Sequence, residues 1–307
     1  MKVLLAGGSG ILGRLATGAL VADGHQVTRL GRGTGNEVRA DLLDRDATLR
    51  AVDGLRFDVV IHAATALSGK SLTRHQDMDA TNALRTTGTA NLLDAAREVG
   101  ARRVVAESMM FGYGYGDHGD TLLAEDTAVF GPKGRNAALE RHLGAMRAKE
   151  ELMLGARGVE GIALRFGIFY GAGVTDTTVV PMLRKRALPV VADHGRALSW
   201  VEVGDAARAI AAAVRTGRAG QAYNITDDTP LGFGTHVRAV SEAFGTPRPM
   251  TVPLWMLCAT PLAHTIMSTQ LRLDNARARA ELGWTPTHAD SLQGVRALAR
   301  DSGPLAA

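Results

Sequence analysis

The chain opens with Met1-Lys2-Val3-Leu4-Leu5-Ala6-Gly7-Gly8-Ser9-Gly10-Ile11-Leu12-Gly13-Arg14, which predicts a buried strand, a glycine turn and the start of a helix. Residues 3–6 are apolar without alternation, as expected of a central parallel strand covered on both faces. Gly7, Gly10 and Gly13 then follow at the spacing G-x-x-G-x-x-G. Together these features predict a site for the pyrophosphate of a dinucleotide at the helix N-terminus.

The three glycines have different predicted tasks. Gly7 allows the tight turn, Gly10 lets the backbone approach the diphosphate, and Gly13 lets the helix pack closely on the strand. The free N–H groups and the positive end of the helix dipole would then face the anion. The residues expected to hold the pyrophosphate are Gly7, Ser9, Gly10, Ile11, Leu12 and Gly13.

Length and composition describe an ordinary globular protein and exclude several classes. The 307 residues are 46% hydrophobic and 21% charged, with a net charge of +4. No basic block or aromatic-rich basic stripe suggests a nucleic-acid partner. A lone cysteine, Cys258, excludes an internal disulfide and a cysteine-based metal cluster, and no metal-ligand spacing stands out. We therefore expect a small-molecule substrate and no metal.

The chain carries no pattern typical of a secreted or membrane protein. It begins with a strand rather than a signal peptide, so a cytoplasmic protein is expected. Residues 250–267 are uncharged, but they contain Pro253, Pro261 and His264 and are short for a membrane span. We interpret this segment as a buried helix or a lid.

Strands and helices are predicted to alternate along the first half of the chain. Candidate strands lie at 2–6, 25–30, 36–40, 57–62, 102–107 and 160–166, and candidate helices near 11–23, 45–53, 76–99 and 136–156. This alternation predicts an α/β fold with a doubly wound parallel Rossmann sheet and a ligand at the carboxyl ends of its strands.

A second, smaller and mostly helical domain is predicted from two separate pieces. Residues 1–170 form the dinucleotide-binding domain, and the pattern changes after Gly171-Ala172-Gly173. Residues 202–230, with a helix at 203–216 and a strand at 220–226, are expected to return to the first domain. Residues 171–201 and 231–307 would form the substrate-binding domain, with the substrate in the cleft between the domains.

The end of the second strand favours NADP over NAD as the cofactor. An acidic residue usually stands about 20 residues after the glycines to bind the ribose hydroxyls of NAD. This chain has Arg29 and Arg32 there instead, and a guanidinium such as that of Arg32 suits a 2′-phosphate. Asp41 and Leu42 are expected at the adenine. The small stretch Ala63, Ala64 and Thr65 is expected to pass under the nicotinamide-side ribose.

Six motifs in order resemble the extended short-chain dehydrogenase/reductase superfamily, the group of NAD-dependent epimerases and dehydratases. Besides the glycine motif, the chain matches its "D-V-V-I-H-x-A" at 58–64, "N-x-x-G-T-x-N-L-L-E-A-A" from Asn82 with a longer spacing before Gly88, "L-R-x-x-x-x-Y-G" at 164–171, "F-V-H-V-D-D-x-A" at 200–207 and "L-G-W-x-P" at 282–286. The resemblance implies a nicotinamide cofactor and also assigns Asn82, Phe166 and Gly167 to its site. It further implies that a homodimer is possible, through the helices at 76–99 and 136–156.

The catalytic set is where this chain departs from the resemblance. Redox members of the superfamily use a Tyr-x-x-x-Lys pair and a serine or threonine, but no tyrosine here has a lysine four residues later. If Glu150-Glu151 matches the family's glutamate, His142 or Leu143 takes the tyrosine position and Met146 or Arg147 the lysine position. Met109 takes the serine position, next to Ser108. Lys149 is expected to be a surface charge.

Three residues remain as candidate proton donors. Tyr113 is the first choice because it lies in a glycine-rich loop that would let it move; Ser108 and His142 are the alternatives. The residues expected to line an apolar substrate pocket are Met109, Met110, Tyr113, Tyr170 and Trp200.

The sequence favours an NADP-dependent oxidoreductase that acts on a carbonyl or secondary alcohol of a small, fairly apolar molecule. Two other readings stay open. One is an epimerase, isomerase or cyclase that recycles its cofactor, with a nucleotide sugar as a possible substrate. The other is an NADP-binding sensor without catalysis.

Overall fold

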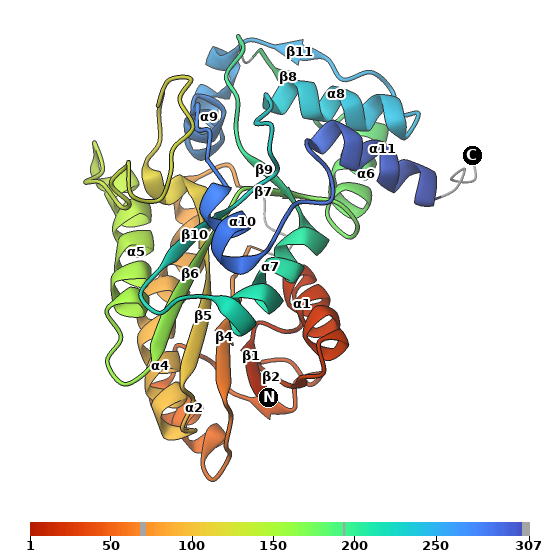
Figure 1. Ribbon diagram of the computed structural model, residues 1–307. Helices are drawn as coiled ribbons and strands as arrows, with labels where there is room; N and C mark the ends of the chain where they lie inside the picture. The colour runs from red at the N-terminus through yellow and green to blue at the C-terminus, as the bar shows by residue number, and fades with distance from the viewer. Residues whose placement is uncertain (68–71, 193, 303–307) are drawn as a thin grey trace.

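The main element of the structure, a computed structural model that describes residues 1–67, 72–192 and 194–302, is a parallel sheet of seven strands (Figure 1). Its strand order is β10-β6-β5-β4-β1-β2-β3. The strands β2 and β3 are added on one side of β1, and the chain then crosses to the other side of β1, where β4 pairs parallel to it. The strands are β1 (Lys2–Ala6), β2 (Gln26–Gly31), β3 (Val38–Arg39), β4 (Val59–His62), β5 (Arg103–Met109), β6 (Glu160–Phe166) and β10 (Ala222–Ile225). This is the predicted Rossmann arrangement, and its switch point lies where the glycine motif leaves β1.

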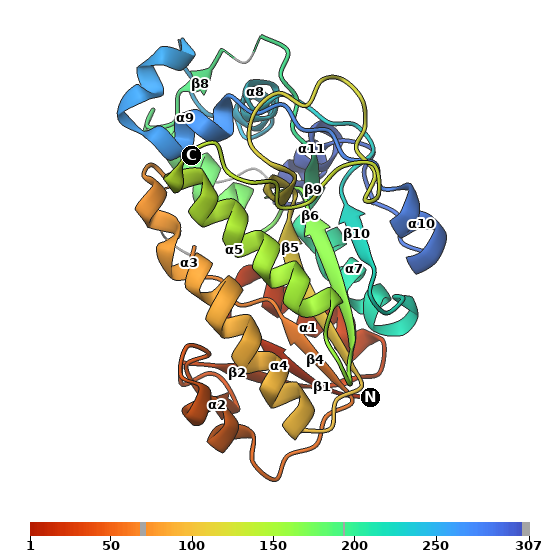
Figure 2. The same cartoon turned by 90° about the vertical axis from the view of Figure 1, so that its left-hand side faces the viewer.

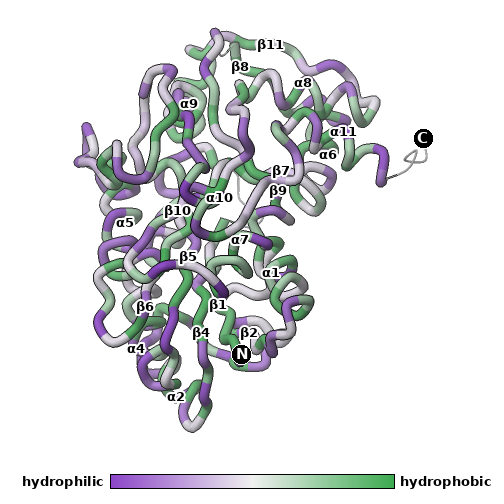
Figure 3. The backbone as a smooth tube through the Cα atoms, viewed as in Figure 1, coloured by the Kyte–Doolittle hydropathy of each residue, from purple (hydrophilic) through white to green (hydrophobic). Residues whose placement is uncertain are grey.

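Helices cover both faces of the sheet (Figures 1 and 2). The helices α1 (Ile11–Ala22) and α7 (Val203–Thr216) pack on one face. On the other face lie α2 (Arg45–Val52), α4 (Thr89–Glu98) and α5 (Ala137–Leu154). Hydrophobic residues follow the central strands in Figure 3, as the unbroken apolar runs in the sequence predict.

The helix predicted at 76–99 is divided into four parts. It consists of the 3₁₀ turn η1 (His75–Met78), α3 (Asp79–Ala83), the π-helical turn η2 (Leu84–Gly88) and α4. The wide turn η2 falls between Asn82 and Gly88, where the sequence is longer than the family pattern, and absorbs part of the additional length. Arg85 lies within this turn and is buried, with 6% exposure.

The second part of the structure is built from short elements beyond the carboxyl ends of the strands. Its core joins β7 (Ile168–Tyr170), β9 (Trp200–Glu202) and α8 (Phe233–Ala243). The remaining elements are η4 (Thr175–Val179), α6 (Val180–Arg184), β8 (Val190–Val191), β11 (Thr251–Val252), η5 (Leu254–Ala259), α9 (Pro261–Met267), α10 (Ala276–Leu282) and α11 (Ser291–Asp301).

Two details of the predicted division need correction. Residues 276–284 were expected in the substrate domain, but Ala278, Leu282 and Trp284 belong to the main core beside α7. Residues 250–267 do not form a buried helix: they form η5 and α9, η5 has no buried residue, and Trp255 is 70% exposed. Among the residues that the structure describes, no helix is both long and apolar enough to cross a membrane.

Asp205 fixes the C-terminal segment to the first turn of α7. Its fully buried carboxylate accepts hydrogen bonds from the backbone N–H and the hydroxyl of Thr287, at 2.6 and 2.7 Å, and pairs with Arg208. The backbone carbonyl of the same residue accepts a bond of 2.9 Å from the indole of Trp284. One buried acid therefore satisfies several donors at once.

We expect the substitution Asp205→Ala to lower the free energy of unfolding by about 3 kcal/mol, because it leaves buried donors without their charged acceptor. Urea denaturation measures the change. The matched control is Glu98→Ala at the exposed end of α4, for which we expect a change within about 0.5 kcal/mol. Equal stabilities of the two variants would contradict this account of Asp205.

Candidate functional site

The glycine motif builds a narrow turn with one open position. Gly7 has φ +89°, and a Cβ there would lie 2.5 Å from the carbonyl oxygen of Ala63. A Cβ on Gly13 would overlap the carbonyl oxygen of Gly7. Gly10 differs: its φ is −71°, and a Cβ would lie 3.5 Å from its nearest neighbour. The fold itself thus requires Gly7 and Gly13, whereas Gly10 borders open space.

The N-terminus of α1 is left without a cap. Gly10 is the N-cap and has no side chain to accept the first N–H groups, and no acidic residue stands in the first turn. Nearby, the guanidinium of Arg14 donates a bond of 2.6 Å to the carbonyl oxygen of Ser9. Uncapped N–H groups at the positive end of a helix beside open space fit a diphosphate. Ser9, Ile11 and Leu12 lie at this turn.

The two arginines of the adenosine end have different surroundings. Arg29 is paired with Glu37 at 2.7 Å, and this pairing lowers the pKa of Glu37 to about 2. The side chain of Arg32 is 75% exposed and only approaches Asp41, at 3.9 Å. No sequence pattern indicates Glu37 as a partner, because it lies eight positions after Arg29, beyond the end of β2. Arg32 is the guanidinium with freedom to meet a phosphate.

The other predicted cofactor residues lie at the same edge of the sheet with differing access. Leu42 is 5% exposed, so its side chain belongs to the core, while Asp41 is half exposed. Ala63, Ala64 and Thr65 follow β4 beside the glycine turn, and Thr65 is exposed. Phe166 ends β6 and Gly167 follows it; Phe166 is fully buried, so it has only backbone atoms to offer.

A buried ion pair joins β6 to α5. The guanidinium of Arg165 donates to both carboxylate oxygens of Glu150, at 2.6 to 3.1 Å, and the hydroxyl of Ser108 donates to Glu150 Oε1 at 2.6 Å. All three residues are 5% exposed or less. Of the two neighbouring glutamates, Glu150 is the buried one and Glu151 is exposed; Met146 and His142 stand one and two turns before Glu150.

Tyr113 is not the mobile residue that the sequence suggested. Its hydroxyl donates to Asn224 Oδ1 at 2.9 Å and accepts from Arg165 at 2.7 Å. The residue is 2% exposed and lies within the 3₁₀ turn η3 (Met110–Tyr113). Burial is the main cause that raises the pKa of Tyr113 to about 12. A fixed, buried hydroxyl of this kind is a poor proton donor to a substrate.

The other two predicted donors are engaged as well. Ser108 is held by Glu150, as described. His142 is fully buried, and its Nδ1 and Nε2 lie 3.0 Å from Asn82 Nδ2 and His75 Nδ1, respectively. Burial, followed by the charges nearby, lowers the pKa of His142 to about 4. All three candidates thus have their polar atoms bound inside the protein.

Lys149 corrects a further expectation. It was predicted as a surface charge, but it is 2% exposed and forms an ion pair of 3.0 Å with Glu107. Burial lowers the pKa of Lys149. Sequence reasoning had no signal for this pair, because its partners come from α5 and β5, 42 positions apart.

Four of the five predicted substrate residues belong to the core instead. Met110, Tyr113, Tyr170 and Trp200 are at most 2% exposed. The indole of Trp200 donates to the carbonyl oxygen of Leu231 and stacks on His236 at 4.0 Å. Met109 is only partly buried and remains at the end of β5. The buried residues Met110, Tyr113, Tyr170 and Trp200 therefore stabilise the fold rather than line a pocket.

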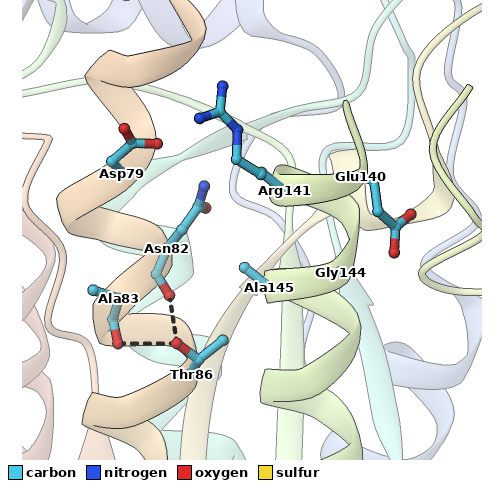
Figure 4. A pocket seen from close by; sticks show the side chains of 8 residues that line it. All are labelled: Asp79, Asn82, Ala83, Thr86, Glu140, Arg141, Gly144 and Ala145. Atoms are coloured by element: carbon cyan, nitrogen blue, oxygen red, sulfur yellow. Dashed lines mark hydrogen bonds between the residues drawn. The ribbon is translucent and has the colours of Figure 1, made fainter. Parts of the chain in front are cut away.

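A surface cavity of about 340 Å³ lies between α3 and α5 (Figure 4). Arg141 extends from α5 toward Asn82 and Asp79 of α3 in this view. Asn82, which was predicted to touch the cofactor, thus separates the cavity from His142. Within the described residues, no three histidine, cysteine or acidic side chains are grouped to hold a metal ion.

We expect Gly10→Ala to weaken dinucleotide binding about tenfold or more while leaving the thermal midpoint unchanged, because the added methyl group has room in the fold but would meet the diphosphate. Calorimetric titration with NADP and NAD measures the affinity. The control is Gly18→Ala in the same helix, where a Cβ meets nothing within 4 Å. Unaltered affinity in the Gly10 variant would place the phosphates elsewhere.

Comparisons with known proteins agree with this geometry. Residues 3–226 match the model of the NAD dependent epimerase/dehydratase family. The chain is 35% identical over 306 residues to a 3-diazoavenalumate denitrifying reductase from a Streptomyces species, covering 94% of this chain and 97% of that protein. It is 30% identical over 269 residues to a 2-alkyl-3-oxoalkanoate reductase from Stenotrophomonas maltophilia, covering 81% and 77%.

The fold is also similar to that of solved structures. A UDP-glucose 4-epimerase from Thermus thermophilus, solved with NAD, superposes with a TM-score of 0.77 at 24% identity, covering 99% of this chain and 100% of that one. An epimerase thus shares this architecture. The chain belongs to the NAD-dependent epimerase/dehydratase family.

Proposed function

We propose that this protein is an NADPH-dependent reductase that replaces a diazonium group by hydrogen on a small carboxylate. The observation that carries the proposal is that Tyr113, Ser108 and His142 all have their polar atoms engaged inside the protein. If Glu150 matches the family's glutamate, Met146 and Met109 stand at the positions of the family's lysine and serine. No Tyr-x-x-x-Lys pair is present, and the three remaining candidates direct their polar atoms to partners inside the protein.

A reaction that requires no proton from the protein suits such a site. When R–N₂⁺ accepts a hydride, a C–H bond forms, the C–N bond breaks and N₂ leaves, so atoms and charge balance without a proton. A carbonyl, in contrast, becomes an alkoxide when it accepts a hydride and must be protonated. The proposal agrees with the relative that is 35% identical, a denitrifying reductase of a diazo carboxylate.

The residues that would hold the cofactor lie along one edge of the sheet. The turn at Gly7, Gly10 and Gly13 would bind the diphosphate, and the segment Ala63 to Thr65 would lie beside the nicotinamide-side ribose. When bound, the reduced nicotinamide supplies the hydride. The chain's own part is to bind and orient the reactants and to keep the buried polar groups satisfied.

The proposal is tested with NADPH and 4-carboxybenzenediazonium as the probe substrate. We expect benzoate and N₂ to form in equal amounts with the loss of NADPH. With cofactor deuterated at the transferred position, we expect the deuterium on the carbon that lost nitrogen. Absence of N₂ release, or benzoate without cofactor-derived deuterium, contradicts the proposal. Formation of 4-hydroxybenzoate and N₂ without loss of NADPH is hydrolysis of the probe by water and also contradicts the proposal.

Reduction of a carbonyl is the second candidate. It is favoured by the 30% identity to a 2-alkyl-3-oxoalkanoate reductase and by the partly exposed Met109 at the end of β5. This activity needs a proton donor other than the three engaged residues. A 2-alkyl-3-oxoalkanoate assayed beside the diazonium probe distinguishes the two candidates.

We expect Tyr113→Phe to retain kcat within about threefold, since a general acid contributes roughly 10²–10⁴ and this hydroxyl does not serve as one. The variant should lose some stability, because Arg165 and Asn224 each lose a partner. Steady-state kinetics and urea denaturation measure the two effects separately. A hundredfold loss of kcat in folded protein would make Tyr113 the acid after all.

We infer that NADP is preferred over NAD because Arg32 is exposed while Arg29 is neutralised by Glu37. Arg32→Ala is expected to weaken NADP binding about tenfold and NAD binding less than about twofold. Arg39→Ala, an exposed arginine of β3, serves as the matched control. Equal losses for both cofactors would contradict this preference.

A further inference from the structure

Four side chains form a continuous hydrogen-bonded chain between α3, α5 and η1. A guanidinium nitrogen of Arg85 donates to Asn82 Oδ1 at 3.1 Å. Asn82 Nδ2 lies 3.0 Å from His142 Nδ1, and His142 Nε2 lies 3.0 Å from His75 Nδ1. The first three residues are buried, and His75 at the end is only partly buried. This series of hydrogen bonds therefore leads from the interior to the surface.

The direction of every bond in this chain follows from Arg85. A guanidinium only donates, so the Asn82 atom that meets it is the oxygen, and the amide nitrogen faces His142. His142 Nδ1 must then accept, which puts the proton of its neutral ring on Nε2. That proton is donated to His75 Nδ1. His75 consequently carries its own proton on Nε2, and this N–H points outward as a donor.

His75 belongs to a segment that follows β4 at the carboxyl edge of the sheet, where a substrate is expected. η1 follows the loop that leaves the carboxyl end of β4, and α5 begins at the same edge. The second part of the structure meets this segment, because the backbone N–H of Leu262 in α9 donates to the carbonyl oxygen of Thr73 at 3.0 Å. Nε2 of His75 has no hydrogen-bond partner among the described residues.

The charges around His75 favour an anion. Arg74 and Arg141 are exposed, and neither has a carboxylate within 4 Å in the part of the chain that the structure describes. The carboxylate of Asp77 is already used by the backbone N–H groups of Thr73 and Arg74, at 3.0 and 2.8 Å. Asp79 at the start of α3 is the acidic neighbour that opposes them. The balance of free charge is positive.

We propose that His75, held in a single tautomer by the chain Arg85–Asn82–His142, binds the carboxylate of the substrate. This inference rests on the proposed function for the identity of the substrate but not for the anion site itself. His75 is a binding residue, and His142 is a positioning residue that acts through it. The cavity beside Asn82 and Arg141 (Figure 4) borders this series of hydrogen-bonded side chains.

Nuclear magnetic resonance of protein labelled with ¹⁵N at histidine tests the site without turnover. We expect both His75 and His142 to be protonated on Nε2, with assignments from His75→Gln and His142→Gln. Benzoate added to the complex with NADP⁺ should shift the His75 signals, whereas benzamide should not. If His75 is protonated on Nδ1, or if NADP⁺ alone shifts His75 and benzoate does not, the proposal is overturned.

Kinetics with 4-carboxybenzenediazonium provide the second test. His75→Leu should raise KM about tenfold with kcat within about twofold, because a bond to a charged group is lost in binding alone. His75→Gln should recover most of the affinity, since its amide both accepts from His142 and donates outward. The methyl ester of the probe should be insensitive to His75→Leu. His25→Leu, at the opposite edge of the sheet, is the matched control.

The outcomes separate the two proposals. An unchanged KM in His75→Leu, in an enzyme that reduces the probe, overturns the role of His75 and leaves the reaction standing. A benzoate-dependent shift of His75 in a protein that never releases N₂ supports the anion site and contradicts the reaction. An equal loss of affinity for the acid and its ester would indicate a purely structural role and overturn the proposal.

Discussion

The arrangement of the site depends on the buried ion pair between Arg165 and Glu150. Two charges with 5% exposure or less are stable only if their remaining donors and acceptors are satisfied, and here Ser108 and Tyr113 supply those bonds. The same bonds remove both hydroxyls from the chemistry. The pair also fixes the rotation of α5, which turns His142 and Met146 inward. The Arg165–Glu150 pair thus both positions α5 and keeps the hydroxyls of Ser108 and Tyr113 from acting as proton donors.

Much of the fold was predictable from the sequence because its signals are local. The apolar run before Gly7 and the spacing of the three glycines predicted β1, the turn and α1, and α7 lies at its predicted residues. The helix at 76–99 was predicted as one element, whereas the structure divides it at the π turn of η2. At this turn Arg85 and Asn82 are buried, and Asn82 contacts His142 of α5, a pairing 60 positions away that no local pattern signals.

The site was less predictable, since its details are pairings between distant segments. Glu107 with Lys149, Arg29 with Glu37, and His75 with His142 leave no periodic signal. Tyr113 was predicted as mobile from its neighbouring glycines, but Arg165 and Asn224 hold it, and Tyr170 and Trp200 proved to be core. What the sequence did indicate was the absence of the Tyr-x-x-x-Lys pair, and that absence remains the most informative feature of the chain.

The central claim is that this site transfers a hydride to its substrate without a proton from the protein. Single-turnover reduction of 4-carboxybenzenediazonium in H₂O and in D₂O, at matched cofactor occupancy, tests it most directly. The account predicts equal rate constants in the two solvents, because no exchangeable proton moves in the reacting step. A rate constant in D₂O that is lower by about half or more would mean that a protein group donates a proton, and it would contradict the account.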